Sequence, residues 1–339
     1  MTRSDMVTKL LLAVFFLTPS LVSASEVILK SGQKLEGKIV EQTDKYIKID
    51  TGIGLSVTYY RDEIDKINTQ QAHTPAPVAP PAQTASPSKE EDPTSIPGWE
   101  LVWDDEFTGD QVDSAKWSFE TGNGDNGWGN GQLDYARPDN IEVKDGQLVL
   151  TVKKEDYEGF HYTSTRMVTK DKMDFQYGRI EIRAKVLDGQ GVGTAFWMLG
   201  SNFRDPDWTW PKCGEVDIFE IAGRDPGFSI GTAHYAEKWG HQTSQGRYRL
   251  PDGEKFSDDY HTFSIEWDEN KIDWYVDSEK INTLDISRPF NGLRPFNNKF
   301  FLVLNTTVGG NFWGAPNDST EFPMTAYVKW VRVYKKEEE

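Results

Sequence analysis

Residues 213–221 read CGEVDIFEI, a run in which three carboxylates stand among apolar and β-branched side chains. This composition predicts a β-strand. Side chains alternate between the two faces of a strand, so Glu215 and Asp217 share one face. Glu220 is five positions from Glu215, and strict alternation would point its carboxylate into the core. Because an unpaired buried carboxylate is very costly, a regular strand does not suit this sequence.

One extra residue in the strand removes the conflict. We expect a β-bulge near Ile218 or Phe219, which returns Glu220 to the face of the other two carboxylates. Val216 and Ile221 then lie on the opposite face, toward the core. Bulges are over-represented beside active sites because they re-aim a side chain, so this strand is a candidate active site.

Three carboxylates on one face of a rigid strand suit the hydrolysis of glycosidic bonds with retention of configuration. That reaction needs one carboxylate as the nucleophile and a second carboxyl as the acid and base, about 5–5.5 Å apart. The third carboxylate would hold the nucleophile in place by a hydrogen bond. The competing interpretation is a solvated polar strand face, which the residue types alone leave equally open.

Composition narrows the class of protein. The 339 residues carry a net charge of −17, which argues against nucleic acid and anionic membrane surfaces as partners. Twelve tryptophans together with this acidity suit a neutral carbohydrate, whose ring faces stack on aromatic side chains. The single cysteine, Cys213, can form no intrachain disulfide and is expected to be a small buried apolar residue.

The first residues resemble a secretory signal. Residues 1–24 contain an apolar core at 10–17 and the small-residue cleavage site VSA at 22–24. The apolar core is too short to span a bilayer, so the mature chain is predicted to have no transmembrane segment. We therefore expect a secreted protein, periplasmic or extracellular.

Four further segments follow the signal. Residues 25–68 alternate short strand-like runs with turn residues and predict a small β module of unknown role. Residues 69–97 are rich in Pro, Ala, Thr and Ser and predict a linker. Residues 98–335 form the main domain, and 336–339 form a charged tail.

The main domain is predicted to be all-β. Short alternating segments recur between turn signals, at 147–152, 177–186, 194–199, 261–267, 271–277, 300–305 and 326–334. So many antiparallel strands in one domain indicate a sandwich of two sheets.

The motifs of this domain are those of a known family. They are WDDEF (103–107), GNGQL (129–133), YTSTR (162–166), YGRIE (177–181), AFWML (195–199), WPKCGEVDIFE (210–220), GTAHY (231–235) and LNTTVGGN (304–311). In this order they resemble glycoside hydrolase family 16, and within it the bacterial laminarinase-like endo-β-1,3-glucanases. The resemblance covers about 98–335, and the whole set is far more specific than any single motif.

The resemblance implies a β-jelly-roll sandwich whose concave face holds an open glycan cleft. It implies that Glu215 is the nucleophile, Asp217 its assisting carboxylate and Glu220 the acid and base. Glu220 must first be protonated, and two neighbouring carboxylates would raise its pKa. The residues expected to bind substrate are Trp128, Asn130, Arg166, Trp197, Trp210, His234 and Asn305. The expected partner is β-glucan, the expected state is a monomer, and no cofactor or catalytic metal is expected.

Many members of the family hold a structural calcium on the convex face. The ligands include an aspartate of the final strand and a carbonyl near an Asp-Gly turn. This chain has Asp145-Gly146 for the turn but Lys329 where the aspartate usually stands. An ammonium cannot ligate a hard cation. The ammonium of Lys329 could replace the charge of the ion by hydrogen bonding to main-chain carbonyls. The alternative is that calcium persists through other oxygens while Lys329 points to solvent, so a structural calcium is possible but doubtful.

The expected function is secreted endo-hydrolysis of laminarin-like β-1,3-glucan or mixed-linkage β-1,3(4)-glucan. One alternative is a hydrolase of another β-glycan, such as a β-galactan, because cleft loops rather than the catalytic strand select the substrate. A second alternative is a non-catalytic glucan-binding protein. The intact set Glu215, Asp217 and Glu220 disfavours the second alternative, because binding alone does not need all three.

Overall fold

A computed structural model describes residues 25–29, 34–42, 46–50, 56–60, 64–69 and 94–337. The predicted signal at 1–24, residues 70–93 of the predicted linker and the last two residues of the tail lie outside the described part. The described residues fall into two compact units, one before and one after residue 90. No helix of the described residues is both long enough and apolar enough to cross a membrane.

The first unit is a five-stranded antiparallel sheet. Its strands are β1 (Ser25–Leu29), β2 (Lys34–Gln42), β3 (Tyr46–Asp50), β4 (Ser56–Tyr60) and β5 (Ile64–Thr69), in the order β4-β3-β2-β1-β5. Val27, Ile47 and Ile64 form its small core. The run Ile64–Thr69 was not predicted as a strand, yet it pairs with β1, and an irregular register at Ile28/Leu29 accommodates it.

The second unit contains all other strands. In chain order they are β6 (Trp99–Asp105), β7 (Ser118–Phe119), β8 (Asp134–Ala136), β9 (Ile141–Val143), β10 (Leu148–Tyr157), β11 (Phe160–Val168), β12 (Gly178–Lys185), β13 (Val192–Gly200), β14 (Glu215–Ala222), β15 (Phe228–Glu237), β16 (Gly240–Arg249), β17 (His261–Trp267), β18 (Lys271–Val276), β19 (Glu279–Asp285), β20 (Phe300–Val308) and β21 (Met324–Lys336). Short helical turns lie at Gly127–Gly131, Pro138–Asn140, Pro206–Trp208, Pro251–Gly253 and Pro295–Asn297. Each of the seven predicted strands of this domain is present.

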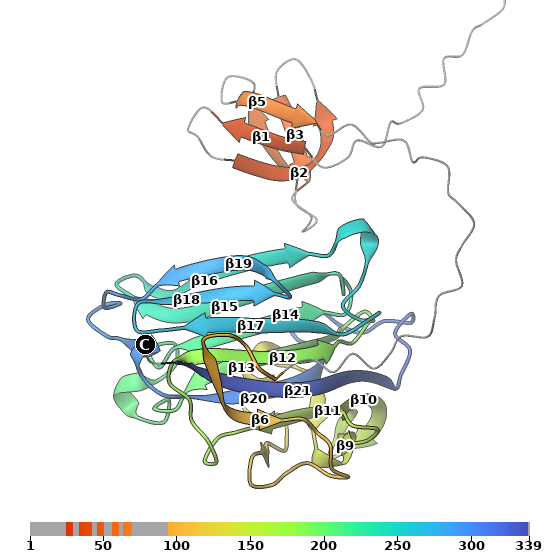
Figure 1. Ribbon diagram of the computed structural model, residues 1–339. Coiled ribbons are helices and arrows are strands. Elements are labelled where there is room, and N and C mark those ends of the chain that lie inside the picture. The colour runs from red at the N-terminus through yellow and green to blue at the C-terminus, as the bar shows by residue number, and fades with distance from the viewer. Residues whose placement is uncertain are drawn as a thin grey trace, which may run out of the picture. The chain divides into compact units, whose positions relative to one another are not determined.

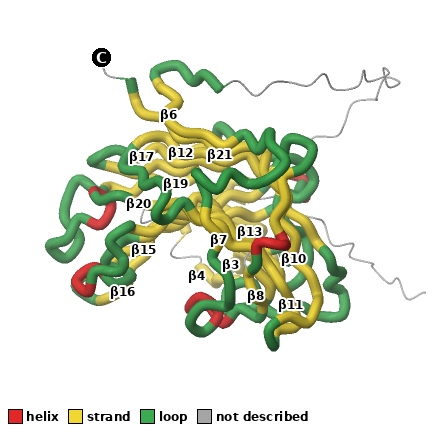
Figure 2. The backbone as a smooth tube through the Cα atoms, turned by 90° about the horizontal axis from the view of Figure 1, so that it is seen from below, coloured by secondary structure: helices red, strands yellow, loops and turns green. Residues whose placement is uncertain are grey.

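These strands form two packed layers (Figures 1 and 2). The site sheet has the order β16-β15-β14-β13-β20-β11, and the back sheet has the order β10-β21-β12-β17-β18-β19 with β6 beside β21. Strand β10 belongs to both, because its first half pairs with β21 and its second half with β11. The pairing is antiparallel except between β8 and β11, which run parallel. The predicted two-sheet jelly-roll sandwich is confirmed.

The core lies between the two sheets. Alternate side chains of each strand point inward, as Phe196 and Met198 do from β13 and Ile180 and Ile182 do from β12, and all four are fully buried in one cluster. At about 25 cal/mol per Å² of buried apolar surface, this cluster is the main source of the unit's stability. Cys213 is also buried, as expected for a small apolar residue.

Candidate active site

Strand β14 carries the three carboxylates and contains the predicted bulge. Its register against β13 places Trp197 opposite Asp217 and Phe196 opposite Phe219, so Ile218 is the extra residue. The pairing with β15 is irregular at the same point. The expectation of a bulge near Ile218 or Phe219 is therefore confirmed, and it turns Glu220 toward the face that holds the other two carboxylates.

The bulge has a specific support from the back sheet. A bulge disrupts the ladder locally and leaves a main-chain group in need of another partner. The indole Nε1 of Trp274 on β18 donates a hydrogen bond of 2.9 Å to the main-chain oxygen of Asp217. The indole reaches this oxygen past Gly231 on β15, where a Cβ would lie 2.6 Å from Trp274 Cδ1. A glycine at this position therefore makes room for the contact.

Burial raises the pKa of all three carboxyls. Burial raises the pKa of Glu215 first, and the charge of Asp217 raises it further. Burial also raises the pKa of Asp217, while a hydrogen bond with Glu215 opposes the rise. For Glu220, burial and then the charges of both neighbours raise the pKa well above its ordinary value. The sequence analysis predicted this direction for Glu220 from the two nearby carboxylates.

His234 and Trp210 contact two of the carboxylates. His234 lies opposite Glu215 in the pairing of β14 with β15. Its Nε2 is 3.0 Å from Oδ2 of Asp217 and 4.0 Å from Oε1 of Glu215. The shorter distance is a close polar contact, although Oδ2 of Asp217 accepts no hydrogen bond of regular geometry from the described residues. Trp210 Nε1 donates to Oε2 of Glu215 at 2.7 Å, so a neutral donor also stabilises charge on this carboxylate.

A second group of predicted residues lies further across the site sheet. The guanidinium carbon of Arg166 is 4.3 Å from the ring centroid of Trp128 and 5.1 Å from that of Trp197. Trp197 Nε1 donates to Oδ1 of Asn305 at 2.7 Å. Asn305 lies between Arg166 and Ala195 in the strand register, and Ala195 lies opposite Glu220. One row across the sheet therefore connects this aromatic group to Glu220.

Asn130 and Trp128 belong to the turn Gly127–Gly131. The side-chain oxygen of Asn130 accepts a hydrogen bond of 3.3 Å from the main-chain N–H of Phe312, and its main-chain oxygen accepts one from Asn311. Asn130 thus holds two loops together, and its side-chain oxygen is already engaged. Trp128 packs on Gly124, where a Cβ would be only 2.5 Å from the indole ring.

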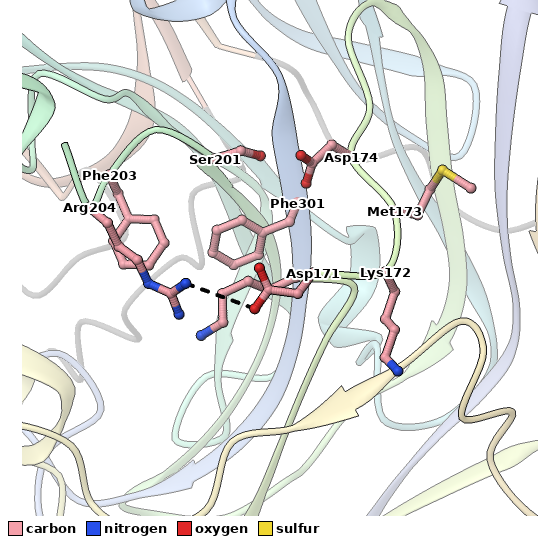
Figure 3. A pocket seen from close by; sticks show the side chains of 9 residues that line it. Asp171, Lys172, Met173, Asp174, Ser201, Phe203, Arg204 and Phe301 are labelled. Carbon is pink, nitrogen blue, oxygen red and sulfur yellow. Dashed lines mark ion pairs between the residues drawn. The ribbon is translucent and has the colours of Figure 1, made fainter.

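A small cavity lies on the same face of the site sheet. It has a volume of about 160 Å³, and Figure 3 shows the rings of Phe203 and Phe301 close to the ion pair of Arg204 and Asp171. Phe301 on β20 is opposite Leu199 on β13, which is opposite Glu215. At about 4.8 Å per strand, the cavity starts about 10 Å from the backbone of Glu215.

Two contributors to the site were not predicted from sequence. His241 on β16 approaches His234, with 2.8 Å between Nε2 of His241 and Nδ1 of His234. Glu120 accepts a hydrogen bond of 2.7 Å from Nε of Arg166 and one from Lys170. The signal for His241 was available, because a tight hairpin brings positions 234 and 241 to the same face. No local pattern marked Glu120, which precedes its partners by about 50 residues.

Ligand atoms of Glu215, Asp217 and His234 lie within 4.8 Å of one another, a spacing at which three residues could hold a cation. The same atoms have protein partners here. Trp210 donates to Glu215, and His234 pairs with Asp217. The arrangement is therefore accounted for by contacts among the side chains themselves.

In the described part of the chain, Lys329 does not make the expected hydrogen bonds to main-chain carbonyls. Its Nζ is 5.0 Å from the ring centroid of Tyr260, whose hydroxyl donates to Gln147 at the end of the turn that contains Asp145 and Gly146. Within residues 94–337 its ammonium donates to no main-chain carbonyl, because the aromatic face attracts the cation instead. The lysine does stand near this turn, and an ammonium there does not fit a calcium site.

Comparison with known proteins assigns the family. A model described as glycosyl hydrolases family 16 matches residues 131–332. Glucan endo-1,3-beta-glucosidase A1 of Niallia circulans is 39% identical over 72% of this chain, which spans only 39% of that relative's length. Beta-glucanase of Rhodothermus marinus is 38% identical over 70% of this chain and 86% of its own. The crystal structure of the laminarinase catalytic domain from Thermotoga maritima MSB8 is 42% identical, with a TM-score of 0.65 over 71% of this chain and 99% of that domain. This chain therefore belongs to glycosyl hydrolases family 16.

Proposed function

We propose that this protein is a retaining endo-glycosidase that hydrolyses laminarin-like β-1,3-glucan, with mixed-linkage β-1,3(4)-glucan as a second substrate. The observation that carries the proposal is the bulge at Ile218, because it brings Glu215, Asp217 and Glu220 to one face of β14. The names of the relatives support β-glucan as the substrate, since they include a glucan endo-1,3-beta-glucosidase, a beta-glucanase and a laminarinase.

In the first step, the carboxylate of Glu215 attacks the anomeric carbon while Glu220 gives its proton to the leaving glycosidic oxygen. Trp210 orients Glu215 through the indole N–H. The pKa of Glu220 is raised by burial and by two neighbouring carboxylates, which keeps this group protonated for the donation. The products of the step are a glycosyl ester on Glu215 and the released glucan fragment.

In the second step, Glu220 removes a proton from water, which attacks the anomeric carbon and releases Glu215. Once Glu215 is an ester it carries no charge, so one of the causes that raised the pKa of Glu220 disappears. Glu220, which gave its proton to the leaving oxygen in the first step, therefore stays deprotonated more readily and accepts the proton of water as the base. One fixed geometry thus supports both steps.

Further residues are proposed to bind the glucan along the site sheet. The aromatic side chains would stack on sugar rings, and the polar side chains would bond to hydroxyls. This set comprises Trp128, Asn130, Arg166, Trp197, Trp210, His234 and Asn305. We also propose that the protein is secreted by the signal at 1–24, acts as a monomer and needs no cofactor.

The test is product analysis on a panel of laminarin, mixed-linkage β-glucan and β-galactan. We expect oligosaccharides of intermediate length from laminarin, and proton NMR of the fresh products should show the β-anomer first. Oligosaccharides released from β-galactan alone would show that the substrate is a β-galactan and not a β-glucan. Binding of laminarin without any product would identify a glucan-binding protein, and the α-anomer as first product would exclude the double displacement.

A further inference from the structure

His241 lies on the same face of the site sheet as the three carboxylates, one strand further out. Strands β15 and β16 form a hairpin in which Ala236 is opposite His241 and His234 is opposite Thr243. Positions 234 and 236 share a face of β15, so His234 and His241 are diagonal neighbours on one face. The two imidazole rings lie 5.0 Å apart between centroids with 18° between their planes.

The ring of His234 is in contact at both nitrogens. Nε2 faces Oδ2 of Asp217 at 3.0 Å, and Nδ1 faces Nε2 of His241 at 2.8 Å. An ionised carboxylate has no proton to donate, so the contact of Nε2 with Oδ2 of Asp217 is attractive when Nε2 carries the proton, although its geometry is not that of a regular hydrogen bond. A neutral imidazole has only one N–H, and Nδ1 of a neutral His234 must therefore accept.

When His234 is neutral and its Nδ1 accepts, His241 is the donor of the hydrogen bond between the two rings, through Nε2–H. A histidine tautomer is set by the hydrogen bond that its other nitrogen makes. Donation from His241 to Nδ1 therefore fixes His234 in the form that presents Nε2–H to Asp217. Burial and the neighbouring His234 lower the pKa of His241, which favours the neutral ring that can act in this way.

His241 also contacts the other polar support of the site. Its ring centroid is 4.7 Å from that of Trp210, whose ring is half exposed. The same indole donates to Oε2 of Glu215 at 2.7 Å. One side chain thus contacts both the histidine that faces Asp217 and the tryptophan that faces Glu215.

We infer that His241 is a positioning residue for hydrolysis, which fixes the tautomer of His234 on Asp217 and supports Trp210 against Glu215. The inference rests on the proposed function for its kinetic consequence, but the tautomer itself is a property of the unliganded protein. It assigns His241 no direct contact with the reacting atoms.

The experiment compares two substitutions that separate the hydrogen bond from the ring. His241→Phe keeps an aromatic ring against Trp210 and removes the donor. His241→Gln places an amide N–H where Nε2 of the imidazole was and removes the ring. His161→Phe is the matched control, because His161 is an exposed histidine of β11 that pairs with the exposed Asp156, away from the three carboxylates. Ring nitrogen-15 NMR of His234 reports the tautomer without substrate, and kcat and KM on laminarin report its consequence.

We expect wild-type protein to carry the His234 proton on Nε2 with Nδ1 as an acceptor. His241→Phe should give a mixture of tautomers and lower kcat about threefold to tenfold, the value of one ordinary hydrogen bond, with KM little changed. His241→Gln should restore the tautomer, and the control should match wild type. An unchanged His234 tautomer in His241→Phe would overturn the inference even if laminarin is not the substrate. A change confined to KM would also overturn it, because that result indicates direct binding of sugar.

Discussion

The indole nitrogen of Trp274 donates to the main-chain oxygen of Asp217, so a buried residue of the back sheet holds the bulge of strand β14. Trp274→Phe keeps most of the ring and removes this donor. We expect a loss of about 1–3 kcal/mol in the free energy of unfolding, because a buried carbonyl is left without its partner. Since the same carbonyl fixes the turn between Asp217 and Glu220, kcat on laminarin should fall as well.

The matched control for this prediction is Trp267→Phe. Trp267 is also buried on the back sheet and donates to a main-chain oxygen, that of Phe296, at the same distance of 2.9 Å. It should cost similar stability, measured by urea unfolding, with kcat near wild type in the folded protein. Equal kcat losses in the two variants would show that the effect is general destabilisation and has no connection with the bulge.

The proposed catalytic pair makes a direct prediction. Glu215→Gln and Glu220→Gln should each lower kcat by about 1,000-fold or more while leaving glucan binding intact, because each removes one member of the two-carboxyl mechanism. Azide should rescue Glu220→Ala on a substrate with an activated leaving group, since that nucleophile needs no general base. Glu142→Gln, an exposed change on β9, serves as the control. Near wild-type turnover in either Gln variant would refute the assignment.

The raised pKa of Glu220 also predicts a pH-dependent stability difference. A carboxyl whose folded pKa is raised contributes stability below its unfolded pKa, about 4.3, and loses that contribution as pH rises through the folded value. Glu220→Gln cannot ionise and avoids this loss. Its melting temperature should exceed that of wild type by a margin that grows from pH 4 upward. A margin that is constant or shrinks with pH would contradict the burial of charge at this position.

The division into two units predicts that the second works alone. Residues 94–339 should fold and hydrolyse laminarin without the first unit, because the compact unit after residue 90 contains every proposed site residue. The measurements are the melting temperature and kcat/KM of the shortened chain against the full chain. An insoluble or inactive fragment would mean that the boundary lies elsewhere.

The position of Lys329 predicts that the thermal stability of the protein does not depend on calcium. A chelator should not change the melting temperature of wild type, because the ammonium of Lys329, which lies over Tyr260 near the Asp145-Gly146 turn, cannot ligate a cation and would repel one. In Lys329→Asp the melting temperature should rise with calcium concentration. The free energy of unfolding should increase by about 2.7 kcal/mol when calcium is present at 100 times its dissociation constant. Lys329→Ala is the control that removes the charge without adding a ligand. A clear destabilisation of wild type by chelator would show that calcium is held through other oxygens.

The bulge at Ile218 could be predicted from the sequence, because a regular strand would bury the carboxylate of Glu220 at a large cost in free energy. One extra residue restores this side chain to the face of the other two carboxylates. The two-sheet sandwich could also be predicted, because the alternation of apolar and polar residues can be recognised within each short strand. The hydrogen bond from Trp274 to Asp217 could not be predicted, because the two residues are 57 positions apart and come into contact only when the two sheets pack. Strand β5 was missed because its apolar pattern is short, and the place of Lys329 depends on Tyr260, about 70 residues earlier.

The pairing of β6 with β21 has a consequence for how the second unit is made. Trp103 near its beginning is opposite Val333 near its end, so more than two hundred residues separate the two partners. Contacts between such distant residues slow folding, because a long loop must close before they form. The back sheet can be completed only after β21 has been synthesised. Until then, the apolar edge of β12 that β21 later occupies is exposed to other chains, so aggregation competes with folding during this interval.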